Sequence, residues 1–109
     1  MQVTRFDKAK PYDAKNHFAM TAIRLQGGDA TDSEDFWVGH STFLPGGGTE
    51  WGSSPTSKVY VVIDGYMSVK TAKEEVELGP MDSIYLEPNE ERSILNKRNQ
   101  VALMLVIST

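Results

Sequence analysis

The sequence predicts an all-β domain, either a sandwich or a barrel. Short segments rich in β-branched and aromatic residues recur along the chain, and Gly- or Pro-containing turn signals separate them. No window shows the 3.6-residue apolar period of an amphipathic helix. With 109 residues, the chain has room for one domain only. Many short strands at regular spacing in a chain of this size are typical of a sandwich or a barrel.

Eight strands are expected, in order at residues 18–25, 36–44, 59–63, 66–71, 75–78, 83–86, 93–95 and 101–107. Asp64-Gly65 is the sharpest hairpin signal, because a tight primed turn needs positive φ values. Residues 45–48 (Pro-Gly-Gly-Gly) are interpreted as a loop, since no helical pattern follows that would make them a phosphate-binding element. Residues 1–15 precede the first strand and are expected to form an arm that lies on the body or on a partner.

Composition argues against several classes of function. The chain has 11 Lys and Arg against 15 Asp and Glu, and a mildly acidic protein without a basic stripe is a poor nucleic-acid binder. No apolar run approaches the roughly 20 residues of a membrane helix, and the N-terminal residues lack the apolar region of a secretory signal. Cys is absent, which removes disulfides and thiolate metal sites. We expect a cytoplasmic protein that binds neither nucleic acid nor membranes.

Two of the expected strands are apolar on both faces. Residues 59–63 (Val-Tyr-Val-Val-Ile) and 101–107 (Val-Ala-Leu-Met-Leu-Val-Ile) lack the alternation of a strand with one face in water. A second layer must therefore cover the other face of each strand. In so short a chain we expect that layer to be a second copy, which makes a homodimer. The alternative is a thick core within one chain.

Two segments resemble the conserved motifs of the cupin superfamily. Residues 42–48 (TFLPGGG) followed by residues 58–65 (KVYVVIDG) look like the first motif, and residues 78–96 look like the second. The resemblance covers about residues 36–107. It implies an antiparallel double-stranded β-helix, the cupin jelly-roll barrel, in a single domain that is usually dimeric.

The same resemblance concerns a metal site. Cupins place His-x-His, a Glu and a late His around a divalent transition metal, and these positions fall on Gly52, Ser54, Lys58 and Arg92. Two potential cations then stand among the positions that should bind the metal, and a divalent cation beside them would be repelled. We therefore expect no metal and no cofactor.

Strand alternation gives the direction of the candidate site residues. If Lys58 points into the barrel, Tyr60 does too, and Glu50 shares the face of Ser54. Trp51 would face the other way or roof the mouth. Apolar walls are expected from Val62, Met67, Leu86 and Met104.

The two basic residues favour an anionic ligand. The planar fork of Arg92 matches a carboxylate, and Lys58 adds a second positive charge. We expect a small organic anion in the barrel, with Ser54 and Trp51 as further ligand contacts. Two alternatives stay open: Glu50 neutralises one of the cations, or both side chains reach water at the rim.

Catalysis would be a further step. Lys58 beside another cation would have a lowered pKa that suits a base or a Schiff-base amine. Tyr60 could donate a proton and Glu50 could accept one. These candidates fit a metal-independent isomerase, lyase or cyclase that acts by proton transfer. The alternative is a non-catalytic small-molecule-binding or accessory module, because the sequence shows no catalytic triad. The direction of His40 is left open.

Overall fold

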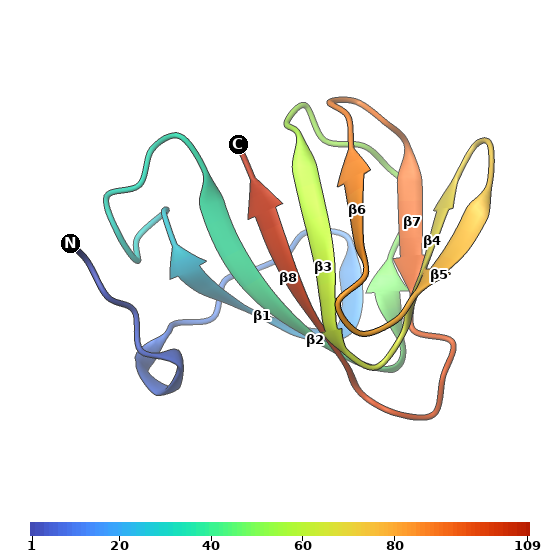
Figure 1. Cartoon of the computed structure of the whole chain (residues 1–109), viewed down its shortest axis with the longest axis horizontal. Helices are drawn as coiled ribbons and strands as arrows, with labels where there is room; N and C mark the ends of the chain where they lie inside the picture. Colours follow the sequence, from blue (N-terminus) through green and yellow to red (C-terminus); the bar gives the residue numbers. More distant parts are fainter.

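The computed structural model describes all 109 residues and contains eight strands and one short 3-10 helix (Figure 1). The elements are η1 Phe6–Lys8, β1 His17–Gln26, β2 Trp37–Thr49, β3 Lys58–Asp64, β4 Met67–Thr71, β5 Glu75–Leu78, β6 Ser83–Leu86, β7 Arg92–Leu95 and β8 Ala102–Ser108. The all-β prediction is confirmed, and every strand except β2 begins and ends within one residue of its expected range. No helix is long and apolar enough to cross a membrane.

The strands form one antiparallel sheet that curls into a nearly closed jelly-roll barrel (Figure 1). The order is β5-β4-β7-β2-β8-β3-β6, and β1 pairs with β2 outside this path. One wall therefore contains β1, β2, β8, β3 and β6. The other wall contains β7, β4 and β5, and the long strand β2 contacts both walls.

The prediction of a loop at residues 45–48 is wrong, because these residues continue β2 to Thr49. At this end β2 leaves β8 and pairs instead with β7, where Gly48 lies opposite Leu95. A Cβ built on Gly48 would lie 2.1 Å from the carbonyl oxygen of Ile94. Glycine here therefore permits close approach of two strands, a role that local sequence cannot distinguish from a turn.

The turn at Asp64-Gly65 forms as expected, but it does not make a hairpin. Gly65 has a φ of 75° and its N–H donates to Oδ1 of Asp64 at 3.0 Å. However, β3 pairs with β6 and β8, whereas β4 pairs with β5 and β7. The turn thus carries the chain from one wall of the barrel to the other. Its residues specify the bend but not the strand partners.

Apolar side chains fill one half of the barrel. Phe43, Val62, Met67 and Met104 are at most 1% exposed and belong to a core cluster of eleven residues. A buried polar side chain, Asn96, supports the same end of the barrel. Its side-chain amide donates to the carbonyls of Phe43 at 3.2 Å, Leu44 at 3.3 Å and Gln100 at 2.8 Å. Because every donor contact is made, the amide is buried without a large desolvation cost.

The N-terminal arm lies along the edge of β1. The N–H of Tyr12 donates to the carbonyl of Ala22 at 3.0 Å, and the N–H of Arg24 donates to the carbonyl of Lys10 at 2.9 Å. The arm thus satisfies backbone groups that an edge strand would otherwise expose. From there it continues across the open end of the barrel to His17.

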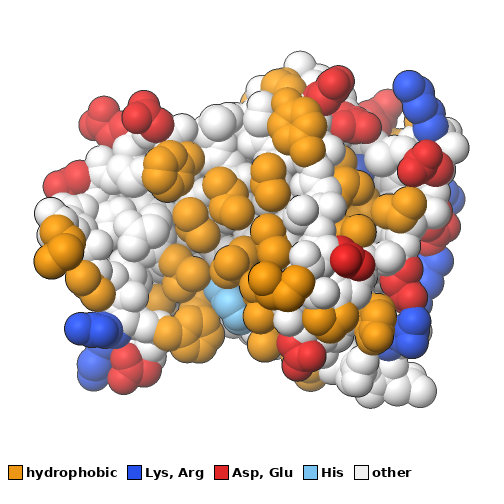
Figure 2. Space-filling model, viewed as in Figure 1, with side chains coloured by type: hydrophobic (Ala, Val, Ile, Leu, Met, Phe, Trp, Pro, Cys, Tyr) orange, Lys and Arg blue, Asp and Glu red, His pale blue; other side chains and the backbone are white.

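The outer face of the wall that contains β2, β8 and β3 is largely apolar. Its outward side chains alternate with buried ones and are partly exposed: Val38 and His40 on β2, Leu103, Leu105 and Ile107 on β8, and Val59, Val61 and Ile63 on β3. Figure 2 shows apolar side chains gathered across the middle of the molecule. The ring of Phe6 packs edge-on against His40 at a centroid distance of 4.9 Å. We call these eight strand residues the outer face.

Candidate functional site

The barrel is hollow at the end opposite Asn96. A cavity of about 340 Å³ opens there between the arm, the wall of β1, β2 and β8, and the first residues of β3 and β7. Ser41, Tyr60, Met104 and Val106 point inward along its walls. The packed half of the barrel lies beyond them, so the cavity is closed at its inner end.

Lys58 and Arg92 reach this cavity from different walls. Lys58 is the first residue of β3 and Arg92 is the first residue of β7. The Arg92 guanidinium donates to the hydroxyl of Tyr60 at 3.3 Å and to the carbonyl of Gly52 at 3.5 Å. Lys58 Nζ donates to Oγ of Ser108 at 3.4 Å. Both cations are therefore held by neutral groups.

No carboxylate neutralises either cation. The ion pairs of the chain are Lys97–Glu75 and Arg98–Glu77, both outside the cavity. The alternative in which Glu50 pairs with Lys58 or Arg92 is therefore wrong. Burial lowers the pKa of Lys58, and the nearby Arg92 and Arg24 guanidiniums lower it further. The lowered pKa shows that positive charge in this cavity is costly.

A chain of hydroxyl groups links Lys58 with Ser54. Oγ of Ser54 lies 3.0 Å from Oγ1 of Thr56, which lies 3.0 Å from Oγ of Ser108. Lys58 Nζ donates to the same Ser108 oxygen. Since each hydroxyl can rotate to donate or accept, the chain can adjust to either protonation state of Lys58.

Arg24 is a third cation of the cavity, which the sequence analysis missed. Its guanidinium carbon lies 4.0 Å from the centre of the Tyr12 ring and 4.6 Å from that of the Trp37 ring. Lys58 Nζ lies 4.8 Å from the same Trp37 ring. Arg24 follows the buried Ala22 by two positions on β1, so it shares the inward face. A charged residue in phase with an inward alanine is the signal that could have revealed it.

His17 also lines the cavity and was not expected there. Its Nδ1 lies 2.7 Å from the carbonyl oxygen of Lys15 and its ring stacks on Phe43. A carbonyl can only accept, so Nδ1 carries the proton in this contact and the neutral ring keeps Nε2 as an acceptor. Burial lowers the pKa of His17, and the charges of Arg92 and Lys58 lower it further. The hydrogen bond to the backbone carbonyl of Lys15 acts in the opposite direction and raises this pKa. The site thus holds a neutral imidazole that can accept a proton.

The lowered pKa of His17 makes folding stability depend on pH. Above the ordinary value of 6.5 the imidazole is neutral in both states. Below it the unfolded chain binds a proton that the folded protein resists, so stability falls until the pH passes the folded pKa. Burial lowers the pKa of His40 as well. We expect His17→Gln to flatten the acid-side decline in the free energy of urea unfolding. His40→Gln should remove a separate part, and an unchanged slope in His17→Gln would contradict this assignment.

Glu50 and Trp51 lie at the rim. A shallow hollow of about 80 Å³ contains both and shares His17, Tyr60 and Arg92 with the cavity. The indole N–H of Trp51 donates to Oε2 of Glu91 at 3.0 Å, which fixes the orientation of a ring that is 46% exposed. The structure therefore brings Lys58, Tyr60, Arg92 and Ser54 together inside, with Glu50 and Trp51 at the mouth.

Among the four expected apolar wall residues, only Met104 lines the cavity. Val62, Met67 and Leu86 are at most 2% exposed and fill the packed half. Strand alternation predicted their inward direction correctly. It contains no information about depth along the barrel axis, which is why it placed them in the cavity.

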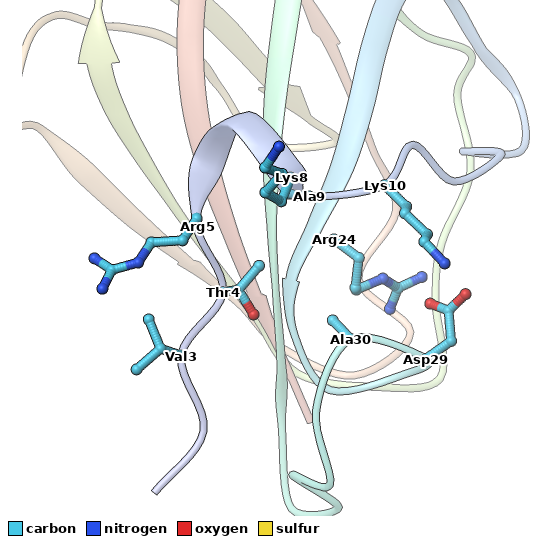
Figure 3. A pocket seen from close by; sticks show the side chains of 9 residues that line it. All are labelled: Val3, Thr4, Arg5, Lys8, Ala9, Lys10, Arg24, Asp29 and Ala30. Atoms are coloured by element: carbon cyan, nitrogen blue, oxygen red, sulfur yellow. The ribbon is translucent and has the colours of Figure 1, made fainter.

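A second hollow, of about 450 Å³, lies outside the barrel between the arm and β1 (Figure 3). Lys10, Arg24 and Asp29 lie together on one side of it, whereas the Arg5 side chain points away from them (Figure 3). Its basic groups are therefore dispersed, unlike those of the barrel cavity.

A curled antiparallel jelly roll with a polar cavity at one end defines a barrel of the cupin type. The chain belongs to the cupin family, since the Cupin domain model matches residues 39–108. The chain is 42% identical over 106 residues to β-D-galactosidase Rv1717 of Mycobacterium tuberculosis, covering 97% of this chain and 91% of the relative.

Solved structures share the fold. The polyketide cyclase RemF from Streptomyces resistomycificus superposes with a TM-score of 0.86 at 17% identity, over 99% of this chain and 78% of the other. A cupin sugar phosphate isomerase from Silicibacter pomeroyi gives a TM-score of 0.80 at 18% identity, over 96% and 73%. At these identities the likeness concerns the fold alone.

The residues of the cavity do not fit the divalent metal that the family's motif implies. The motif positions carry Gly52, Ser54, Lys58 and Arg92, which supply neither imidazole nor carboxylate. No group of three His, Asp or Glu side chains gathers anywhere in the chain. The donor set thus lacks the ligands that divalent transition metals prefer, and two of its members are basic.

Proposed function

We propose that this cupin binds a small organic anion in the barrel cavity, between Lys58 and Arg92 and without a metal. The convergence of two cations with no carboxylate partner is the observation that carries the proposal. Unpaired charge in a partly buried site is costly, so an anion that pairs with it gains binding energy. The Arg92 fork suits a carboxylate or phosphate, and its contacts with Tyr60 and Gly52 hold it in place.

The cavity also has the groups needed to move a proton on such a ligand. His17 Nε2 would accept a proton from the carbon or hydroxyl next to the anionic group. The Tyr60 hydroxyl or the Lys58 ammonium would return one to a second atom of the ligand. The net reaction is an isomerisation, or an elimination when the second atom departs with its proton. Glu50 and Trp51 would contact the part of the ligand that extends past the rim.

One structural relative is named an isomerase, which agrees with the first of these reaction classes, and another is named a cyclase. The sequence relative is named a β-D-galactosidase, which makes hydrolysis of a neutral β-galactoside the second candidate function. The rim favours it in one respect, because Glu50 and Glu91 flank the exposed Trp51. Glycoside hydrolysis commonly uses two carboxylates.

Binding of gluconate, measured by titration calorimetry, tests the first candidate. We expect Lys58→Met and Arg92→Leu each to weaken binding by about tenfold or more, because each removes a charge-assisted contact. The matched controls Lys97→Met and Arg98→Leu change cations outside the cavity and should bind like the wild type. Unchanged affinity in both cavity variants would overturn the proposal.

Two activity measurements decide between the readings of the site. Exchange of the proton on the carbon next to the carboxylate into deuterated water, followed by NMR and lost in His17→Gln, supports proton transfer. Binding without exchange supports the non-catalytic module. Hydrolysis of nitrophenyl β-D-galactoside that is lost in Glu50→Gln but kept in Lys58→Met supports the second candidate.

We also propose that a second copy of the chain covers the outer face. Eight outward side chains, all but His40 apolar, lie side by side on three neighbouring strands. An apolar sheet face in water forgoes roughly 25 cal/mol for each Å² that burial would remove. The face is self-complementary in chemistry and lies apart from the cavity, so dimerisation would leave the mouth open.

A further inference from the structure

We propose that the ligand of the cavity carries two negative charges, as in a phosphate monoester or a dicarboxylate, and that Arg24 binds the second charge. This inference rests on the proposed function, because it assumes that Lys58 and Arg92 bind the first. It adds a binding residue from β1, outside the segment that resembles the cupin motifs.

The Arg24 guanidinium is covered on its faces and unpaired in its plane. The Tyr12 and Trp37 rings lie within 5 Å of its central carbon. Its Nε is buried without a hydrogen-bond partner, and the guanidinium lies against Gly28. A guanidinium stacked in this way still needs acceptors around its edge, because stacking satisfies none of its five N–H donors.

Arg98 provides an internal comparison. Its guanidinium carbon also stacks on an aromatic ring, 4.2 Å from the centre of Tyr66. It donates two hydrogen bonds to Glu77, from Nε and Nη2, so its plane is satisfied. The two arginines differ in that Arg24 forms no ion pair, although Asp29 lies on the same side of the hollow outside the barrel (Figure 3). An anionic ligand in the cavity would supply acceptors to the terminal nitrogens of Arg24.

The charge of the cavity is too large for one negative group. Arg24 and Lys58 both lie over the Trp37 ring, and Arg92 lines the same cavity. Asp13 is the one acidic side chain on the cavity wall, against four basic ones when Lys15 is included. A monoanion bound by Lys58 and Arg92 would leave Arg24 uncompensated. A dianion can neutralise both ends at once.

The volume of about 340 Å³ admits a ligand of this kind. It falls near the lower end of the range for small-molecule sites, roughly 300–1,000 Å³. A six-carbon sugar acid or sugar phosphate has the corresponding size. Two acidic groups on one such skeleton would reach toward different cations.

Calorimetry with glucarate and gluconate tests the inference, because these ligands share one carbon skeleton and differ by one carboxylate. We expect the wild type to bind glucarate roughly tenfold tighter than gluconate. Arg24→Met should abolish this preference, so that the ratio of the gluconate and glucarate affinities falls to about one. The matched control Arg98→Met should keep the full preference. Glucose 6-phosphate, compared with glucarate, distinguishes a phosphate from a second carboxylate.

The outcomes separate the two proposals. Equal affinities of the wild type for gluconate and glucarate, with glucose 6-phosphate no tighter, would overturn the role of Arg24 and leave the proposed function standing. Binding of none of the three anions would overturn the proposed function itself. A preference that survives in Arg24→Met would also contradict the inference. If Arg24→Met does not fold, Arg24→Lys keeps the charge without the planar fork and should bind glucarate several-fold more weakly than the wild type.

Discussion

Replacement of Leu105 by Glu should prevent the proposed dimer from forming. Leu105 lies at the centre of the outer face, opposite His40 on β2 and Val61 on β3. In a dimer through this face, two carboxylates would be buried among apolar side chains without a partner. Such burial costs several kcal/mol, so we expect the dissociation constant to rise by roughly a thousandfold or more. Sedimentation equilibrium across a range of protein concentrations measures the change.

The control for this experiment is Lys70→Glu. Lys70 is an exposed residue of β4, on the other wall of the barrel, so the variant adds a carboxylate to a strand without touching the outer face. It should remain dimeric. A wild type that is monomeric at every concentration would overturn the dimer proposal, as would a Leu105→Glu variant that associates like the wild type. Gluconate binding should be the same in both variants if the cavity is independent of the interface.

Gly48→Ala should strongly destabilise the fold, because Gly48 lies where β2 pairs with β7. The new Cβ would lie 2.1 Å from the Ile94 carbonyl oxygen and 3.0 Å from Cα of Leu95. Both neighbours are backbone atoms of β7, so the clash can be relieved only by separating two paired strands. We expect a loss of more than about 3 kcal/mol, and a melting temperature lower by roughly 10 °C or more. Thermal unfolding followed by circular dichroism measures both.

Gly52→Ala is the matched control, since it adds the same methyl group nearby. A Cβ on Gly52 has no heavy atom within 4 Å, and the residue does not have a positive φ. Its unfolding free energy should stay within about 0.5 kcal/mol of the wild type. Equal melting temperatures for Gly48→Ala and Gly52→Ala would show that β2 and β7 can move apart without cost.

The strands could be predicted from sequence because their signals are local. Alternation and turn residues set the ends of seven strands to within one residue. The errors concern contacts between distant segments. Gly48 was taken for part of a loop because the strand that approaches it, β7, lies more than forty residues later. The turn at Gly65 was correct, but the partners of β3 and β4 depend on the whole sheet.

The residues that line the cavity could be predicted where the cupin resemblance reached them. Lys58, Ser54 and Arg92 lie in the matched segment and line one cavity. His17 and Arg24 belong to β1, which the resemblance does not cover, and they reach the cavity only because β1 pairs with β2. Arg24 could have been predicted from strand alternation, because it lies two positions after Ala22 and so shares its inward face. The position of His17 depends on the path of the arm, which no sequence pattern indicated.

The packed half of the barrel has a practical consequence. An anion bound as we propose could advance no farther than Tyr60 and Met104 at the inner end of the cavity, so it would enter and leave through the same opening. A group attached to the other end of this ligand would extend past Trp51 into solvent. A resin or a fluorophore coupled to that end should therefore not prevent binding. Competition against such a coupled ligand offers a direct way to identify the natural ligand.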